Sequence, residues 1–132
     1  MGQYFVIANT TKKEYLHPHR FGEGLKFMEF TMDSAGILHG FAHLMAQSSE
    51  GVHIDCDAVT GRWIGDHVLI VGDYDESDIF NEAYKSYVDI SEIVINHIAQ
   101  DRYVREALSE RSRWDSGNGK LKVFETAQEV QN

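Results

Sequence analysis

The sequence predicts an α+β fold: a single compact domain over residues 1–125, with a mainly antiparallel sheet packed by two helices, and a frayed tail at 126–132. Three observations lead to this class. The 132 residues are 42% hydrophobic and 25% charged, which are ordinary values for one globular domain. Runs of β-branched and aromatic residues at 3–8 and 67–71 are typical of strands. Apolar stripes at helical spacing over 35–47 and 90–111 are typical of amphipathic helices.

The first half of the chain is expected to begin with a hairpin. Residues 3–8 form its first strand and 14–17 its second, after which Pro18 ends regular pairing. Residues 25–32 are expected as a third strand, although a short helix fits that stretch nearly as well. A helix follows over 35–47, with Asp33 or Ser34 as its N-cap. Its apolar stripe consists of Ile37, Leu38, Phe41, Leu44 and Met45.

The second half is expected to supply the remaining strands and one long helix. Residues 67–71 are a continuous apolar run between two Gly-Asp pairs, which predicts a central buried strand. An acidic loop then extends from Tyr74 to Glu82. Asp89, with Glu92 three residues later, predicts a capping box at the start of the helix over 90–111. A turn at 116–119 and a final strand at 121–124 complete the order.

Charge and composition exclude several classes of function. The formal net charge is −9, and most of it lies in residues 51–100, where two cations face ten acids (2 − 10 = −8). Such a surface repels phosphate backbones, so we do not expect general nucleic-acid binding. The sequence shows neither a membrane-spanning run nor a signal-peptide pattern. We therefore do not expect it to bind membranes. The single cysteine, Cys56, excludes an internal disulfide, so we expect a cytoplasmic protein.

Cations are in local excess only between residues 12 and 26, where four of them face two acids. The stretch from Arg20 to Lys26 combines a guanidinium, two glycines and an ammonium, a composition that can turn backbone N–H groups toward an anion. Tyrosines on the adjacent strands add ring surface. The first hypothesis is therefore a non-catalytic module that binds a small anionic, nucleotide-like ligand and requires no cofactor; a solvated hairpin is the plainer alternative. Its candidate ligand-binding residues are Tyr4, Tyr15, His17, His19, Arg20 and Lys26.

Histidines suggest a second hypothesis, a metal-dependent hydrolase. His39 and His43 lie one helical turn apart on the polar face of the helix over 35–47, a spacing that can hold one transition-metal ion. The pattern lacks the glutamate of an HExxH motif, so Asp66 or Asp73 would have to support the reaction. Solvated or hydrogen-bonded histidines are the plainer alternative. Whether the protein is an enzyme stays open at this point, with binding favoured.

Two further patterns point to partners. Gly36 and Gly40 are small residues four apart, which allow close backbone approach and suggest a homodimer contact. The acidic segment 55–82 suggests a protein-interaction or inhibitor role. Within it, Cys56 lies between two aspartates that raise the pKa of its thiol, which disfavours a nucleophilic cysteine.

Several motifs in the first 75 residues recur together in one family. The chain resembles a family of small, uncharacterised phage and bacterial proteins that begin GQYY and carry LHPH, GLKLMEF and WxGD…GDY motifs. It departs from them with Phe5 in place of the second Tyr and Phe27 in place of Leu. The resemblance implies no reaction and no catalytic residue; it implies a phage or mobile-element setting, in which a host protein is a candidate partner for host takeover or anti-defence. The matching stretches are residues 2–5, 14–22, 24–30, 63–66 and 71–74.

Overall fold

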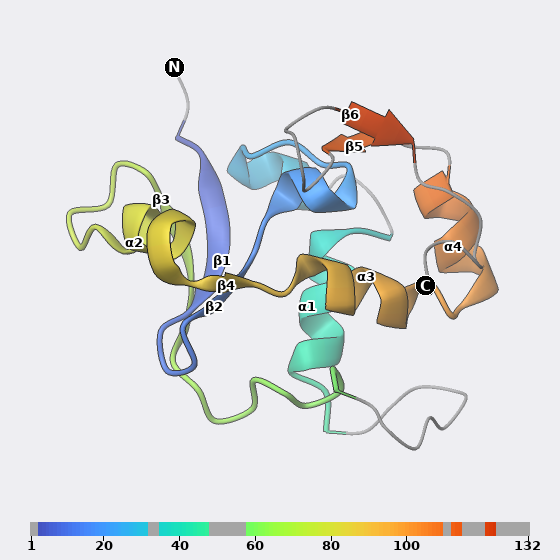
Figure 1. The fold of residues 1–132 in the computed structure, drawn as a ribbon, viewed down its shortest axis with the longest axis horizontal. Helices are drawn as coiled ribbons and strands as arrows, with labels where there is room; N and C mark the ends of the chain where they lie inside the picture. Colours follow the sequence, from blue (N-terminus) through green and yellow to red (C-terminus); the bar gives the residue numbers. More distant parts are fainter. Residues whose placement is uncertain (1–2, 32–34, 48–57, 110–111, 115–120, 124–132) are drawn as a thin grey trace.

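The computed structural model describes residues 3–31, 35–47, 58–109, 112–114 and 121–123, and it confirms the α+β class (Figure 1). The strands are β1 (Phe5–Asn9), β2 (Glu14–Leu16), β3 (Val68–Gly72), β4 (Val88–Asp89), β5 (Ser112–Trp114) and β6 (Leu121–Val123). The helices are α1 (Ile37–Leu44), α2 (Ile79–Ser86), α3 (Ser91–Ile98) and α4 (Arg102–Ser109). Two short 3-10 helices, η1 (Pro18–Phe21) and η2 (Phe27–Thr31), follow the first hairpin.

The main sheet has the strand order β3-β1-β2-β4. β1 pairs antiparallel with β2 and with β3, whereas β2 pairs in parallel with β4. β1 is thus an inner strand, and its residues Val6, Ile7 and Ala8 are fully buried. β5 and β6 form a separate antiparallel pair. The predicted, mainly antiparallel sheet is confirmed.

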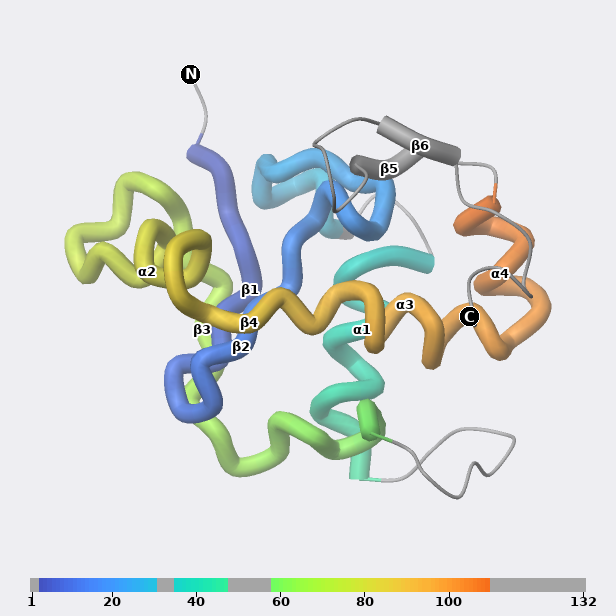
Figure 2. The backbone as a smooth tube through the Cα atoms, viewed as in Figure 1, coloured from blue at the N-terminus to red at the C-terminus, as the bar shows by residue number. Residues whose placement is uncertain are grey.

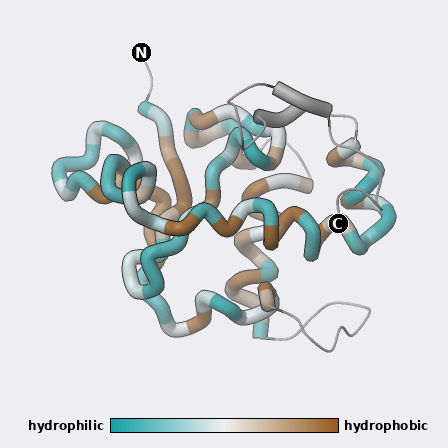
Figure 3. The backbone as a smooth tube through the Cα atoms, in the orientation of Figure 1, coloured by the Kyte–Doolittle hydropathy of each residue, from teal (hydrophilic) through white to brown (hydrophobic). Residues whose placement is uncertain are grey.

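Helices cover both faces of this sheet (Figures 1 and 2). On one face, Ile7 and Leu16 belong to a core that also holds buried residues of α1, α3 and α4. On the other face, Val6 and Ala8 pack with α2, whose buried residues are Phe80 and Ala83. Hydrophobic positions are concentrated along β1 and α3, while the loop between β3 and α2 is mostly hydrophilic (Figure 3). The sheet therefore forms the middle layer of three.

Helices α1 and α3 cross at Gly40, which is buried. A Cβ atom at Gly40 would lie 2.5 Å from Val94 Cγ1 of α3 and 3.2 Å from the ring of Phe21. Gly36 lies against the carboxylate of Glu23, whose Oε1 accepts a hydrogen bond of 2.6 Å from the Ile37 N–H at the start of α1. The two glycines thus allow close packing within the chain, and the homodimer that they suggested stays a prediction.

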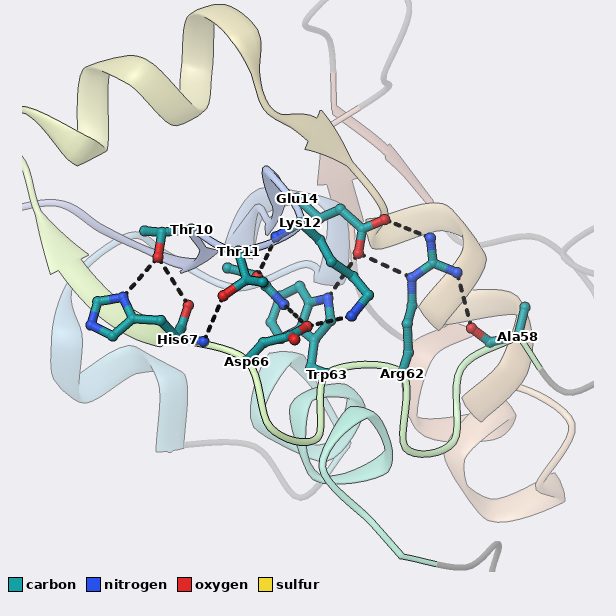
Figure 4. A network of polar contacts seen from close by, with 10 residues as sticks. Thr10, Thr11, Lys12, Glu14, Ala58, Arg62, Trp63, Asp66 and His67 are labelled. Atoms are coloured by element: carbon teal, nitrogen blue, oxygen red, sulfur yellow. Dashed lines mark hydrogen bonds and ion pairs between the residues drawn. The ribbon is translucent and has the colours of Figure 1, made fainter.

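A polar network attaches residues 58–67 to the β1–β2 hairpin (Figure 4). Glu14, only 8% exposed, accepts hydrogen bonds from Arg62 and from the indole N–H of the fully buried Trp63 at 2.9 Å. Burial by itself would raise the pKa of Glu14, but the hydrogen bonds from Arg62 and Trp63 outweigh it and lower that pKa. Asp66 accepts from Asn9 at 2.8 Å and from Lys12 at 2.5 Å. The conspicuous Trp63–Asp66 stretch therefore has a structural role.

The structure corrects the predicted helices. The single helix expected over 90–111 is two, α3 and α4, because Asp101 caps α4 by accepting hydrogen bonds from the N–H groups of Tyr103 and Val104. The helix expected over 35–47 is confirmed as α1. A further helix, α2, was not expected; it begins within the expected acidic loop. At the start of α3, Asp89 Oδ1 accepts the Ser91 N–H at 2.9 Å, close to the predicted cap.

Two predicted strands also need correction. Residues 25–32 do not form a strand; the 3-10 helix η2 occupies this stretch, in line with the alternative of a short helix. The apolar run at 67–71 forms β3, but β3 is an edge strand of the main sheet and its residue Ile70 is 39% exposed. The cap at 33 or 34, Cys56, the turn at 116–119 and the tail at 126–132 lie outside the described residues.

Across the described segments, none of the helices is both long enough and apolar enough to cross a bilayer.

Candidate functional site

Four of the six residues predicted to bind a ligand come together at the end of β2: Tyr15, His17, His19 and Arg20. Tyr84 of α2 and Asp89 of β4 join them, and we call these six residues the His17 cluster. The sequence analysis did not assign Tyr84 or Asp89 to this site. The helical spacing of Ile79, Phe80 and Ala83 was the signal that could have placed Tyr84 on a helix over the sheet.

Backbone pairing sets the position of the His17 cluster. The parallel register of β2 and β4 places Tyr15 beside Asp89. The His17 N–H then donates to Ser91 Oγ at 2.9 Å, which fixes the end of β2 against the start of α3. Pro18 begins η1, which suits its fixed φ and missing N–H, and this turn carries His19 and Arg20. The cluster therefore lies where β2, β4 and α3 meet.

The rings of the His17 cluster are in contact. The centroid of the Tyr84 ring lies 5.9 Å from that of Tyr15 and 5.3 Å from that of His17, which it meets edge to face. The rings of His17 and His19 are 5.2 Å apart. Tyr15 is buried, whereas Tyr84 is 40% exposed. The outer side of the cluster therefore presents aromatic and imidazole rings to solvent.

Hydrogen bonds define the protonation state of His17. Its Nδ1 accepts the His19 N–H at 3.1 Å, so the ring proton lies on Nε2 and donates to the Tyr84 hydroxyl at 3.0 Å. Burial, and then the neighbouring His19, lower the pKa of His17 to about 4. Burial also lowers the pKa of His19, with Arg20 adding to the effect. His17 is therefore neutral at pH 7, with both ring nitrogens engaged.

The two tyrosines of the cluster keep their protons near neutral pH. Burial raises the pKa of Tyr15 to about 12, with Asp89 adding to the effect, and burial likewise raises the pKa of Tyr84 to about 12. Arg20 Nε donates to Asp89 Oδ2 at 3.1 Å, so these two charges balance. Neither tyrosine can serve as a base near neutral pH.

The other two predicted ligand-binding residues lie elsewhere. Tyr4 immediately precedes β1, and its main-chain N–H donates to Asp73 Oδ1 at 3.1 Å. Lys26 lies exposed in the turn before η2, with its main-chain N–H on Glu29 Oε1 at 3.0 Å. Neither takes part in the ring contacts or the ion pair of the His17 cluster. Tyr4 was expected to add ring surface from the first strand, and Lys26 to add an ammonium from the loop that begins at Arg20.

The histidines predicted to bind metal also have a neighbour that the sequence analysis missed. The rings of His39 and His43 lie 5.0 Å apart, and His97 of α3 lies 5.0 Å from His43. Asp66 and Asp73, proposed to assist, instead accept hydrogen bonds from Asn9 and Lys12 and from Tyr4. In the part of the chain that the structure describes, no three or more His, Cys, Asp or Glu side chains are arranged to hold a metal ion.

The lowered pKa of His17 predicts a loss of stability in mild acid. Its folded-state pKa of about 4 is below its usual value of 6.5, so the unfolded chain binds more protons between these values. The contribution of neutral His17 to the free energy of unfolding is fully present above about pH 6.5. It is lost as the pH falls toward 4, by on the order of 2–3 kcal/mol. Urea unfolding near pH 7 and near pH 4.5 measures this loss. His17→Gln is expected to remove most of it, and an equal loss in both proteins would contradict the assignment.

Comparison of the chain with protein-family models, with curated proteins and with solved structures gave no match. The roles assigned to residues below therefore come from the chemistry of the described side chains.

Proposed function

We propose that this is a small non-catalytic binding protein whose His17 cluster holds a flat, anionic, nucleotide-like ligand. One observation carries the proposal: four side chains chosen for this chemistry from the sequence converge at one place, joined by Tyr84. They present ring surface beside a guanidinium. Rings of this kind stack on a planar ligand, and Arg is well suited to phosphate and carboxylate groups.

Each group has a distinct role in this proposal. The exposed ring of Tyr84, with His17 held against it, forms the stacking surface. Because His17 donates to its oxygen, the Tyr84 hydroxyl keeps its own proton for an acceptor on the ligand. Asp89 holds the Arg20 side chain in place and also competes with any anion that approaches it. A multiply charged phosphate is therefore a better ligand than a single carboxylate.

The setting proposed for this activity follows from the sequence. The lone cysteine suits a reducing compartment, so we place the protein in the cytoplasm. The resemblance to phage proteins favours a role in conflict between phage and host.

Ligand-observed NMR with nucleoside mono-, di- and triphosphates tests the proposal. We expect at least one of them to bind, and Arg20→Ala and Tyr84→Ala each to weaken binding about tenfold or more. Arg102→Ala is the matched control, because Arg102 lies on α4 with its side chain 74% exposed. Lys26→Ala should also leave binding unchanged. The proposal fails if no nucleotide binds, or if the loss of Arg20 and the loss of Arg102 have the same effect.

A further inference from the structure

A second surface lies at the opposite edge of the sheet from the His17 cluster. Here the structure has a cleft of about 480 Å³ between the start of β1, the strand β3 and the loop that follows β3. Phe5, Ile70 and Gly72 line its apolar part, and Tyr74, Asp75 and Glu76 line its rim. None of these residues belongs to the His17 cluster.

The backbone of β3 is open along this edge. Thr10 pairs with His67 and Tyr4 with Asp73 through main-chain hydrogen bonds of 2.9 Å at the two ends of the β1–β3 ladder. Hydrogen-bonded pairs alternate in an antiparallel ladder, so the N–H and C=O groups of residues 68, 70 and 72 point away from β1. The C=O of Gly72 accepts the Asp75 N–H at 3.1 Å, which leaves residues 68 and 70 as the open part of the edge. Among the described residues, no strand pairs with β3 on that side. An edge of this kind can accept another strand.

The side chains along the cleft indicate the chemistry of the occupant. Ile70 is 39% exposed and Tyr74 62% exposed, and the ring of Phe5 lies 5.4 Å from that of the exposed Phe27. The adjoining loop, residues 73–78, contains four acids and no basic residue. Asp75 and Glu76 are exposed, although Asp75 also accepts hydrogen bonds from the N–H and hydroxyl of Ser77. Apolar and acidic groups therefore alternate over a short distance.

We propose that this edge binds an extended basic segment of a partner protein, which adds to the sheet as a strand beside β3. In this arrangement the partner's main chain pairs with residues 68 and 70. An apolar side chain enters the cleft beside Ile70, and lysines or arginines contact Asp75 and Glu76. Strand addition gives affinity through the main chain, while the charges select the partner. The proposal gives the acidic loop after β3 a defined role in binding, separate from that of the His17 cluster.

A titration of the full-length protein with a short peptide in which lysine and valine alternate tests this proposal. Two-dimensional amide NMR should show shifts concentrated in residues 68–76, with affinity that falls as salt rises. Charge reversal with Asp75→Lys and Glu76→Lys should weaken binding about tenfold or more. Glu106→Lys is the matched control, because Glu106 lies on α4 with its side chain 63% exposed.

Two further peptides complete the test. A peptide in which glutamate replaces lysine should not bind. A lysine–valine peptide with every backbone amide methylated should bind much more weakly, because neither of its edges can then donate hydrogen bonds to β3. Equal binding of the methylated peptide, shifts outside 68–76, or binding unaffected by the charge reversal would each overturn the proposal. It would also be overturned if residues 68–72 shift with protein concentration alone, since a second copy would then occupy the edge. Arg20→Ala should have no effect on any of these results.

Discussion

Trp63→Ala is expected to lower the free energy of unfolding by about 3–5 kcal/mol, the range found when large buried aromatic residues are truncated. Trp63 is fully buried, and its ring meets that of Phe41 at 6.3 Å. Its main-chain N–H also donates to Leu44 O at 3.0 Å, so it lies where residues 58–67 contact the end of α1. The substitution leaves a cavity and removes a donor from the buried Glu14 carboxylate.

Urea unfolding followed by far-UV circular dichroism measures this effect. Trp63→Phe should lower the free energy of unfolding by less, because an aromatic ring stays in the core, although the indole N–H is lost. Tyr103→Ala is the control for loss of an aromatic ring, since Tyr103 is 76% exposed on α4 and should change stability by no more than about 0.5 kcal/mol. A loss below about 1 kcal/mol for Trp63→Ala would show that Trp63 does not anchor this segment.

Gly40→Val is expected to cost about 2–3 kcal/mol, because the crossing of α1 and α3 has no room for a side chain. The first added carbon would lie 2.5 Å from Val94 Cγ1, so helix α3 must move or Val94 must leave its position. Glycine is a poor helix residue, and valine recovers only a few tenths of a kcal/mol of helix propensity. The steric cost outweighs that gain.

Two comparisons isolate the steric effect at Gly40. Ala42→Val places the same side chain on an exposed position of the same helix and should cost less than about 1 kcal/mol. Val94→Ala removes the nearest clashing atom, so in the Gly40→Val background it should recover part of the loss. If Gly40 instead lay at a homodimer contact, its substitution would change the oligomeric state and leave the monomer's unfolding unchanged. Sedimentation velocity distinguishes these outcomes.

Local sequence patterns predicted most of the elements correctly, and tertiary interactions account for the misses. Composition and short apolar runs were sufficient for β1, β2 and β3, because these signals are local. The break between α3 and α4 depends on Asp101 capping a new helix, which competes with an otherwise continuous apolar stripe. β3 was predicted to be central because its residues are apolar on both faces: one face packs on the α2 core, and Phe5 lies against part of the other. Among the described residues, however, β1 is its only strand neighbour. Sheet order is a non-local property that a single apolar run does not encode.

The candidate site was predictable to the extent that its residues are close in sequence. Tyr15, His17, His19 and Arg20 were grouped because they lie within one short stretch. Tyr84 comes from α2, which the acidic composition around its start concealed. Asp89 comes from β4, and the parallel pairing of β2 with β4 places it beside Tyr15. Tyr4 and Lys26 were included because one lies on the neighbouring strand and the other ends the same cationic stretch, and such local cues do not determine where a residue lies in the folded chain.

The strand order has a consequence for how the chain folds as it is synthesised. β1 and β2 are neighbours in the sequence, whereas β3, the other partner of β1, begins only at Val68. The second partner of β2 is β4, which begins at Val88. Contacts between residues so distant in sequence close large loops, which slows folding and leaves an apolar strand without its second neighbour in the meantime. The β1–β2 hairpin is therefore synthesised well before its other partner strands. Until these follow, its apolar residues are accessible to ribosome-associated chaperones.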